Sequence, residues 1–377
     1  MNLKAKQFID TFIGMPLVYI NALMASILGF LCHRDHSLTN PPSTIIFIKL
    51  LGFGSILLAS DSIYSIKRKY PNARIILICS SGILEGASSL NLFDDILVID
   101  DTSFIHILRS SLNVLFKTWR LRNKWVADLE VYSKLTSILS LWTLAGNRFG
   151  FYFNSVAFRY KLNTHNVFFN TVVNVEENYK RMAGCMLADR LEEFHIPGFS
   201  QRNEQQKFQF IAINNTCSEL APERKLLPAQ VMEICIWILE ETPYHIALLG
   251  APGDFETNEQ LIRDMNRQEK IINTAGKYKF TNYFHFLYEQ CKLIITIDSA
   301  PLHIANKLQI PNLSIWGPTT PESRIETNTL NQFVYLGVSC SPCAHVTDQL
   351  PCKGYNFCIR DIELKEIVSK LELLLRN

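Results

Sequence analysis

The sequence lacks any large excess of charge of either sign. Its 377 residues include 37 Lys and Arg against 35 Asp and Glu, and the pI is about 8.0. No global basic field therefore indicates a nucleic-acid partner. A small-residue cleavage site is also missing near the N-terminus, which argues against a cleaved secretion signal. Six scattered cysteines, several in apolar runs, are then typical of reduced, buried side chains in a reducing compartment.

Charged residues are absent altogether from the segment 11–32. This segment is long enough to cross a bilayer, although Gly14, Pro16 and Asn21 interrupt it. Three interpretations stay open: a membrane-seated or re-entrant helix, a true membrane span, and a helix packed on the protein itself. The prolines at 41–42 separate this apolar leader from the rest of the chain.

The rest of the chain is long enough for two domains, and it alternates apolar, β-branched runs with helical patterns. Such alternation is typical of doubly wound α/β domains with parallel strands. A buried strand over 44–49 and a glycine turn at 52–54 open the first domain. A helix is expected near 178–191, and the polar stretch 201–207 is the expected linker to the second domain.

One stretch, 293–320, carries the most specific pattern. It reads as a buried strand, a turn at Asp298 and Ser299, a short helix containing His303, a second strand, and the turn Gly317–Thr319. The unpaired N–H groups at such a helix start suit a phosphate, and Asp298 could accept hydrogen bonds from sugar hydroxyls. Open α/β sheets bind ligands at this edge. A capped helix in an ordinary α/β protein would produce the same pattern.

The motif Asp298-Ser299-x-Pro301-x-His303-x-Ala305, followed by Trp316-Gly317-Pro318-Thr319, resembles the signature of glycosyltransferase family 9. These are the ADP-heptose:lipopolysaccharide heptosyltransferases and their relatives, and the resemblance extends from about residue 45 to the C-terminus. It implies an α/β fold of two Rossmann-like domains facing a cleft, the GT-B architecture, with an N-terminal apolar helix added. The expected parts are a membrane-associating leader (1–40), an acceptor domain (41–200), a nucleotide-sugar donor domain (201–335) and a cysteine-containing tail with a last helix (336–377).

The resemblance also implies that the second domain binds the nucleotide diphosphate of a sugar donor. Lys225 holds the place of a basic residue that contacts the donor phosphates in the family, and a cation above a helix start suits a diphosphate on physical grounds. A surface Arg-Lys pair would read the same. The turn 250–254 resembles the family's glycine-rich loop, after which acids can bind ribose hydroxyls. The expected donor-site residues are Ser218, Arg224, Lys225, Asp254, Glu256, Asp298, Ser299, His303, Gly317 and Thr319.

The N-terminal motif departs from the family at one position. Lys49, Gly52 and Gly54 match it, but Ser55 replaces the aspartate that is the family's usual candidate for the catalytic base. A serine is a poor base at pH 7, although it can hold a water or donate a hydrogen bond to a hydroxyl or phosphate. Glu130, at the expected carboxyl end of a strand, is the candidate replacement. An acid placed at a helix start for dipole reasons alone is the alternative.

Four cysteines follow the Gly-Pro-Thr turn with the spacing C-x2-C-x8-C-x5-C: Cys340, Cys343, Cys352 and Cys358. This spacing permits a structural, tetrahedral zinc site. A reduced cluster of thiols and a disulfide pair fit the same pattern.

The resemblance implies an inverting, metal-independent transfer of heptose or a related sugar. The donor would be ADP-heptose-like and the acceptor a cell-envelope glycan such as lipopolysaccharide core, at the cytoplasmic face of the inner membrane. No cofactor is expected, and the sequence has no Asp-x-Asp motif that would hold a diphosphate-bound Mg²⁺. Two alternatives stay open: a nucleotide-sugar epimerase of the same architecture, and a catalytically inactive, nucleotide-sugar-binding subunit of an envelope-glycan assembly complex.

Overall fold

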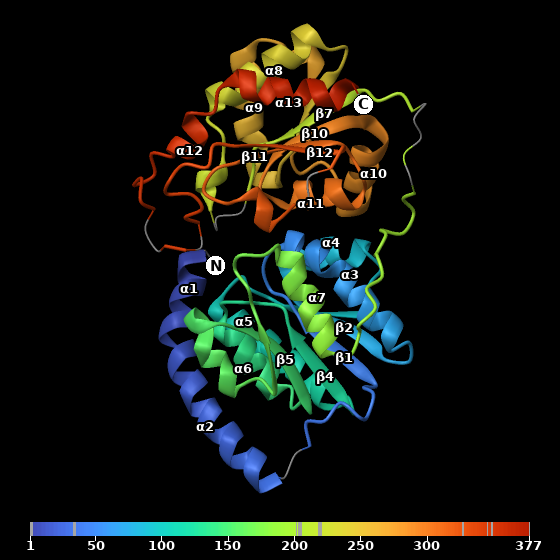
Figure 1. Cartoon of the computed structure of the whole chain (residues 1–377), viewed down its shortest axis with the longest axis vertical. Helices are drawn as coiled ribbons and strands as arrows, with labels where there is room; N and C mark the ends of the chain where they lie inside the picture. The colour runs from blue at the N-terminus through green and yellow to red at the C-terminus, as the bar shows by residue number, and fades with distance from the viewer. Residues whose placement is uncertain are drawn as a thin grey trace. The chain divides into compact units, whose positions relative to one another are not determined.

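The computed structural model of the chain divides into two compact units, Met1–Phe194 (unit 1) and His195–Asn377 (unit 2). The structure describes residues 3–32, 35–200, 202, 206–217, 221–325, 328–344, 346–347 and 350–376. In each unit a parallel sheet lies between helices (Figure 1).

Unit 1 contains, within its described residues, a six-stranded sheet of order β3-β2-β1-β4-β5-β6 in which all neighbours are parallel. Its strands are β1 (Thr44–Ile48), β2 (Arg74–Ser80), β3 (Asp95–Ile99), β4 (Lys124–Asp128), β5 (Asn147–Tyr152) and β6 (His165–Phe168). Its helices are α1 (Leu3–Phe12), α2 (Gly14–Cys32), α3 (Phe53–Lys69), α4 (Ser81–Ser89), α5 (Phe104–Trp119), α6 (Lys134–Trp142), the 3₁₀ helix η1 (Asn154–Lys161) and α7 (Val175–Cys185).

Unit 2 repeats this plan, with a described six-stranded parallel sheet of order β12-β11-β10-β7-β8-β9. Its strands are β7 (Phe210–Asn214), β8 (His245–Leu248), β9 (Ile271–Asn273), β10 (Cys291–Ile297), β11 (Asn312–Trp316) and β12 (Asn331–Tyr335). Its α-helices are α8 (Pro228–Glu241), α9 (Phe255–Met265), α10 (Phe280–Gln290), α11 (Ala300–Lys307), α12 (Phe357–Arg360) and α13 (Leu364–Arg376). The 3₁₀ helices are η2 (Pro222–Arg224), η3 (Pro252–Asp254), η4 (Gln268–Lys270) and η5 (Pro321–Ser323).

The strand order reverses at one place in each sheet. In unit 1 this switch point lies between β1 and β4, and in unit 2 between β7 and β10. Ligands of open α/β sheets bind outside the carboxyl ends of the strands at a switch point, because the connecting loops diverge there. The residues that follow these four strands are therefore the first places to look for a site.

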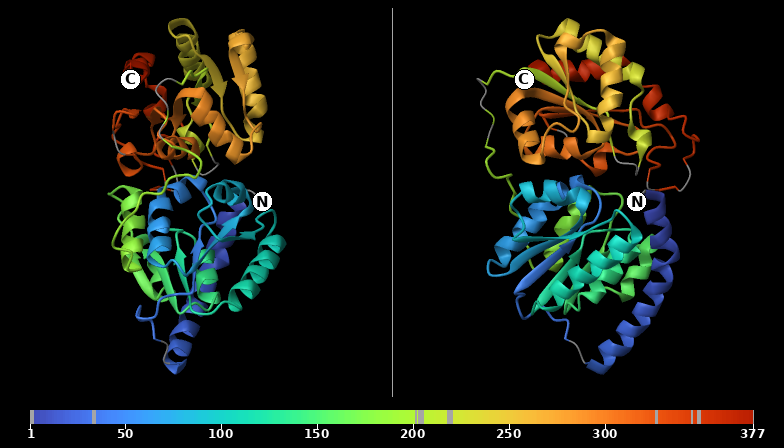
Figure 2. Two further views of the ribbon diagram at one scale, coloured as in Figure 1. Left: turned by 90° about the vertical axis from the view of Figure 1, so that its right-hand side faces the viewer. Right: turned by 180° about the vertical axis from the view of Figure 1, so that it is seen from behind.

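The core of unit 1 has two faces because side chains alternate along each strand. Ile46 and Ile48 of β1 pack in the cluster that contains Val114 of α5 and Leu139 of α6. Phe47 points to the opposite face, where α3 and α7 cover the sheet (Figure 2). Both faces of β1 are buried, as its uninterrupted apolar sequence predicts.

The helix expected near 178–191 is shorter, since α7 ends at Cys185. The chain after it runs along α3 instead. Phe194 N donates a hydrogen bond to Asp61 Oδ1 (2.7 Å), and Glu192 N donates one to Ser65 Oγ (2.8 Å). These side-chain acceptors on α3 satisfy backbone donors that a longer helix would have paired internally.

The apolar leader belongs to unit 1. One face of α2 packs beside α6, with Val18 and Ala22 buried against Ile138 and Leu162 (Figure 1). Asn21, which interrupts the apolar run, is buried and its Oδ1 accepts a hydrogen bond from Trp142 Nε1 (2.6 Å). The interpretation of a helix packed on the protein therefore holds for this face of α2.

Asp10 of α1 attaches the other end of the leader to the start of α6. Its Oδ1 accepts hydrogen bonds from the backbone N–H groups of Lys134 (2.9 Å) and Leu135 (3.0 Å), in the first turn of α6. A carboxylate is favoured at a helix start because the N–H groups there lack helical partners and the helix dipole is positive.

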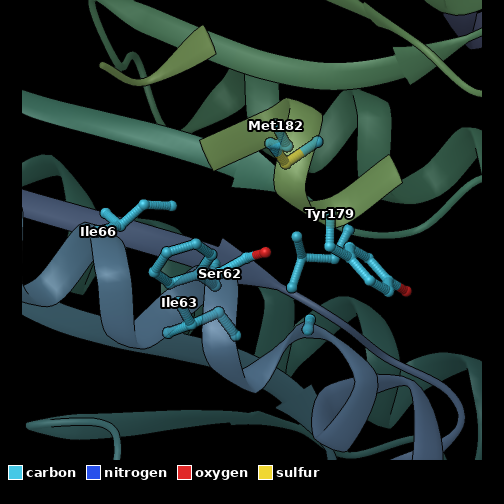
Figure 3. A pocket seen from close by; sticks show the side chains of 8 residues that line it. Ser62, Ile63, Ile66, Tyr179 and Met182 are labelled. Atoms are coloured by element: carbon cyan, nitrogen blue, oxygen red, sulfur yellow. The ribbon is translucent and has the colours of Figure 1, made fainter. Parts of the chain in front are cut away.

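A small void lies between β1, α3 and α7 (Figure 3). Its volume is about 10 Å³, which leaves room for one water at most. It is lined by Phe47, Ala59, Ser62, Ile63, Ile66, Leu129, Tyr179 and Met182. We interpret this mostly apolar void as a packing defect of the core and not as a ligand site.

Replacement of Met182 by alanine should enlarge this void and destabilise unit 1. We expect the variant to lose about 2–5 kcal/mol of unfolding free energy, the cost of truncating a buried side chain whose surroundings cannot collapse. Met182→Leu, which nearly conserves volume, should lose less than about 1.5 kcal/mol. Denaturant unfolding followed by circular dichroism measures both. Equal midpoints for Met182→Ala and the parent would contradict the packing described here.

Candidate functional site

At the switch point of unit 2, a polar side chain at the end of β7 links this strand to β10 and to the turn that follows β10. Asn214 Nδ2 donates hydrogen bonds to Thr296 Oγ1 (3.2 Å) on β10 and to Ser299 Oγ (2.8 Å) just beyond it. Asn214 is buried, so these bonds compensate the loss of water around its amide. The amide fixes the turn that leads from β10 into α11.

Arg224, at the end of η2, lies against the same turn. Its Nη1 donates to the backbone oxygen of Asp298 (2.5 Å) and lies 3.4 Å from Asp298 Oδ2. Its Nε donates to the backbone oxygen of Ala221 (3.0 Å), which orients the guanidinium. The sequence placed the main cation at Lys225, whereas the structure brings the neighbouring Arg224 to the carboxyl end of β10.

Asp298 is buried, with only 4% of the residue exposed. Burial alone would raise the pKa of Asp298, but the guanidinium groups of Arg324 and Arg224 more than offset that effect and hold the pKa below its usual value. Asp298 is therefore an anion near two cations, and Arg224 is the one in direct contact with it. Arg324, just after η5, was not among the residues expected from the sequence. A lone arginine after a Gly-Pro-Thr turn gives little signal until the fold brings it to Asp298.

His303 lies one turn inside α11, as expected, and is buried. Burial is the largest effect on the pKa of His303 and lowers it to about 4; the Asp298 carboxylate raises this pKa, and Arg324 and Arg224 lower it. The imidazole is therefore neutral near pH 7. Among the described residues, none forms a hydrogen bond with its Nδ1. A buried polar atom without a partner is costly, so a bound hydroxyl or water at this nitrogen would be stabilised.

The start of α11 resembles the expected phosphate site in position but not in detail. Ser299 occupies the N-cap position and Pro301 the first turn, yet the Ser299 side chain makes no capping bond. Its hydroxyl instead accepts from Asn214 and lies 3.3 Å from the backbone oxygen of Ile297. The N–H groups of the first turn therefore keep their capacity to bind an anion.

Lys225, Asp254 and Glu256 lie toward the neighbouring strand β8. Lys225 Nζ is 4.0 Å from Asp254 Oδ1, and 42% of the lysine side chain is exposed. Asp254 Oδ2 accepts a hydrogen bond from Ala251 N (2.9 Å) within the glycine turn, and Glu256 is exposed in the first turn of α9. The half-exposed Lys225 side chain can reorient toward a ligand, whereas the Arg224 side chain is held by its hydrogen bonds.

The turn Gly317–Thr319 is held by the tail of the chain. The N–H groups of Cys343 (3.0 Å) and Ala344 (2.9 Å) donate to the backbone oxygen of Pro318, and Ser341 Oγ donates to that of Gly317. A Cβ at Gly317 would lie 2.7 Å from Ile359 Cδ1, so only glycine allows the tail to pack this closely. Thr319 is buried nearby. Ser218, the remaining expected donor-site residue, lies outside the described residues.

The four tail cysteines lie close to one another but form no metal centre among the described residues. Burial and the neighbouring thiols raise the pKa of Cys343 and Cys358, the latter to about 11. Cys340, Cys343, Cys352 and Cys358 are all free, and no described group of three or more His, Cys, Asp or Glu side chains is placed to hold a metal ion. The zinc site, the reduced cluster of thiols and the disulfide pair therefore stay predictions for these four cysteines.

The switch point of unit 1 joins Lys49, just after β1, to Glu130, just after β4. Lys49 Nζ lies 2.9 Å from Glu130 Oε2, and Glu130 Oε1 accepts from the backbone N–H groups of Leu50 and Leu51, both at 2.9 Å. Burial alone would lower the pKa of Lys49, but the Glu130 carboxylate raises it above its ordinary value, so Lys49 stays charged. Glu130 holds the Lys49–Gly52 turn in addition to any chemistry it performs.

A second buried pair lies beneath Glu130. Asp128 and Arg159 have no exposed side-chain surface, and Arg159 Nη2 contacts Asp128 Oδ2. Arg159 Nη1 also donates to the backbone oxygens of Glu130 and of Val131 (2.9 Å). Burial raises the pKa of Asp128 despite the charge of Arg159. Sequence reasoning missed both residues, although an acid inside the apolar strand Trp125–Leu129 predicts a buried cationic partner.

Ser55 sits in the first turn of α3, next to Gly52. Gly52 has φ of +82°, a left-handed conformation that favours glycine. Ser55 N donates to Gly52 O (3.0 Å), and Ser55 is partly exposed. The glycine turn is thus present where the N-terminal motif predicts it, and Ser55 follows it in the first turn of α3.

Comparison with known proteins identifies a family for this chain. The model of the family described as glycosyltransferase family 9 (heptosyltransferase) matches residues 148–353. Lipooligosaccharide heptosyltransferase 2 of Campylobacter jejuni is 30% identical over 88 residues, which cover 23% of this chain and 27% of that protein. Lipopolysaccharide heptosyltransferase 2 of Escherichia coli K12 is 25% identical over 160 residues, covering 42% and 44%. These matches span less than half of either relative. Lipopolysaccharide heptosyltransferase 1 of Campylobacter coli is 24% identical over 288 residues, covering 70% and 80%.

Solved structures agree with the sequence comparisons. The fold is similar to that of the E. coli ADP-heptose lipopolysaccharide heptosyltransferase II (TM-score 0.68, 17% identity, 88% of this chain and 99% of that one). It is also similar to a family 9 glycosyltransferase from Veillonella parvula (0.69, 16%, 89% and 98%) and to the E. coli heptosyltransferase WaaC with ADP-2-deoxy-2-fluoro heptose (0.64, 10%, 87% and 99%). At such identities these likenesses establish the fold, which is GT-B-like with an added apolar N-terminal helix. The matched family model covers more than half of the sequence, and the chain therefore belongs to glycosyltransferase family 9, the heptosyltransferases.

Proposed function

We propose that the chain transfers heptose or a related sugar from a nucleotide-diphosphate sugar to a cell-envelope glycan such as lipopolysaccharide core. The observation that carries the proposal is the cluster of Arg224, Arg324 and His303 around the buried Asp298, at the switch point of unit 2. Fixed cations beside the start of α11 suit a diphosphate leaving group. One homologue of this fold, the E. coli heptosyltransferase WaaC, is solved both with ADP and with an ADP-heptose analogue, which supports an ADP-sugar donor.

In the proposed reaction, a bond forms between an acceptor hydroxyl oxygen and the anomeric carbon of the donor sugar while the bond from that carbon to the diphosphate breaks. The nucleoside diphosphate leaves with the bonding electrons. Lys225, Arg224 and the first turn of α11 at Ser299 stabilise its charge, as fixed donors stabilise a developing anion. Asp254, Glu256 and Asp298 would hold the nucleoside sugar or the cations beside it. No metal or cofactor enters the proposal.

We assign to Glu130 the role of the base that takes the proton from the acceptor hydroxyl. Its Oε1 accepts two backbone hydrogen bonds, which leaves Oε2 as the reacting atom. Among the described residues one donor, Lys49, reaches Oε2, so a lone pair there stays available for an acceptor hydroxyl. Lys49 then orients the carboxylate. A water held by Ser55 is the alternative route for the proton.

The inactive-subunit alternative has one observation in its favour: Glu130 already has three donors around its carboxylate, and Ser55 stands in place of the family's acid. A direct assay separates the candidates. The purified chain is incubated with ADP-heptose, with and without lipopolysaccharide core acceptors, and released ADP is measured. Acceptor-dependent release supports the transferase. Tight binding without turnover supports the inactive subunit, and an isomerised or free sugar without an acceptor supports the epimerase.

Lys225→Ala should weaken ADP binding by about 10- to 100-fold, because a charge-assisted hydrogen bond to a phosphate is lost. The fold should be unaffected, since the lysine is half-exposed and its partner Asp254 is 4.0 Å away. Isothermal titration calorimetry measures the affinity. Lys277→Ala, an exposed lysine of the same unit, is the matched control. Equal affinities for both variants and the parent would remove Lys225 from the donor site.

Glu130→Gln should cut turnover by about two orders of magnitude or more while ADP affinity holds, because glutamine cannot take a proton. The melting temperature should fall as well, since the buried Lys49 loses the charge of its partner. Ser55→Ala is the comparison. A large loss in Ser55→Ala together with normal turnover in Glu130→Gln would assign the proton to the serine-held water.

Lowering the pH from about 6.5 to about 4 should destabilise unit 2 through His303. In that window the unfolded chain binds a proton at this imidazole and the folded chain does not, so the free energy of unfolding falls as pH falls. The part due to His303 is on the order of 1–3 kcal/mol. Thermal melts across the window should show a shallower pH dependence for His303→Asn than for the parent. A parent-like slope in His303→Asn would mean that the imidazole is not held neutral.

A further inference from the structure

The outer face of the leader is apolar. On α2 the side chains that point away from α6 are each 51–66% exposed: Tyr19, Ile20, Leu23, Met24, Ile27 and Leu31. Their spacing repeats every three to four residues, so they share one side of a helix about 28 Å long. Water contact of this many large apolar groups is unfavourable, and contiguous exposed apolar surface on a protein indicates a partner.

A second apolar stripe lies on α5. Its exposed members are Ile105, Leu108, Leu112, Phe116 and Trp119. They also follow helical spacing, and the opposite face of α5 packs on the sheet through Val114 and Leu115.

α6 lies between the two stripes and joins them. Trp119 Nε1 of α5 donates to the backbone oxygen of Trp142 (2.6 Å), and Trp142 Nε1 donates to Asn21 Oδ1 of α2 (2.6 Å). Helix α6 contacts both α2 and α5, so the three helices lie side by side on unit 1 (Figure 1). The middle of α6 is buried. We call the exposed apolar residues of α2 and α5 the outer apolar face.

The charges beside this face differ at its two ends. Lys117, Arg120 and Arg122 are exposed where α5 ends, beside Phe116 and Trp119. The acids near the face lie at the start of α5, where Asp101 is paired with Lys6 of α1. Cations next to exposed aromatic and aliphatic side chains match an anionic lipid surface, where headgroups meet acyl chains.

We infer that the outer apolar face seats unit 1 on an anionic phospholipid bilayer, with α1 and α2 remaining docked on the unit instead of crossing the membrane. Residues 5–31 are long and apolar enough for a span by length and composition. A span would have to detach α2 and so break the Asn21–Trp142 bond, the Asp10 contacts with α6 and the Val18–Ala22 packing. This inference concerns the surface of unit 1 alone and does not rest on the proposed reaction.

Vesicle binding of the detergent-free full chain tests the inference. The chain should co-sediment with vesicles of phosphatidylcholine that contain one-third phosphatidylglycerol. It should bind more weakly to vesicles of phosphatidylcholine alone. Each of Lys117→Ala and Arg120→Ala should lower binding to the anionic vesicles by about fivefold. The two substitutions should leave binding to neutral vesicles unchanged. Equal binding of parent and both variants to anionic vesicles would remove the cations from the contact.

The double variant Leu23→Glu with Ile27→Glu tests the apolar part. Both side chains are exposed, so the variant should melt like the parent yet bind anionic vesicles at least about tenfold more weakly. Ile236→Glu, an exposed isoleucine of α8 in unit 2, is the matched control and should bind like the parent. If the double variant melts early, single variants at Leu108 and Phe116 of α5 provide the same test on the second stripe.

Three outcomes would overturn the inference. Unchanged vesicle binding in both the α2 and the α5 variants would show that the face does not contact lipid. A parent that ignores vesicles but forms a dimer by light scattering, lost in Leu23→Glu with Ile27→Glu, would assign the face to a second copy of the chain. Retention of the bound chain after dilution into an excess of unloaded vesicles would indicate an inserted span, because a seated helix exchanges between membranes.

Discussion

The burial of one carboxylate governs the ligand-binding edge of unit 2. A charge removed from water is tolerated only beside opposite charges and hydrogen-bond donors, and Asp298 has Arg224 and Arg324 for this purpose. Arg224 ends η2 and is hydrogen-bonded to the residue at the end of β10, and the charge of Arg324, just after η5, also acts on this carboxylate. The cations are therefore in place before any ligand binds, and a diphosphate would meet donors that need little rearrangement.

In unit 1, charged side chains at the switch point are likewise compensated by opposite charges, in two ion pairs. Arg159 binds Asp128 and the backbone oxygen after it, while Glu130 binds Lys49 and the turn after β1. In both units the strand order reverses where these charges lie, so backbone groups freed by diverging loops are satisfied by side chains.

Much of this arrangement could be predicted from the sequence because it is local. The strand-turn-helix pattern around Asp298 and Ser299 and the glycine turn at Gly52 are set by residues that are neighbours in the chain. Arg324, Asn214 and the Asp128–Arg159 pair could not be predicted, because their partners are distant in sequence and a lone arginine or asparagine has no periodic signature. The leader was ambiguous for a related reason: composition gives its apolarity, but only tertiary contacts at Asn21 and Asp10 decide which face is covered. Ser299 is the opposite case: the local sequence predicts a capping residue, but its hydroxyl accepts a hydrogen bond from the distant Asn214 instead.

The packing of the tail on Gly317 has a consequence for how the chain matures. A polypeptide synthesised as far as β12 already contains every described strand of both sheets, yet its Gly317 and Pro318 carbonyls still lack the donors that Ser341, Cys343 and Ala344 supply. Asn356 likewise reaches back to the carbonyl of Glu223, next to Arg224. The loops at the carboxyl edge of the unit 2 sheet are thus completed last, from the C-terminal end. A chain truncated by premature termination or nicked in this region would keep its sheets while losing the contacts that hold these loops.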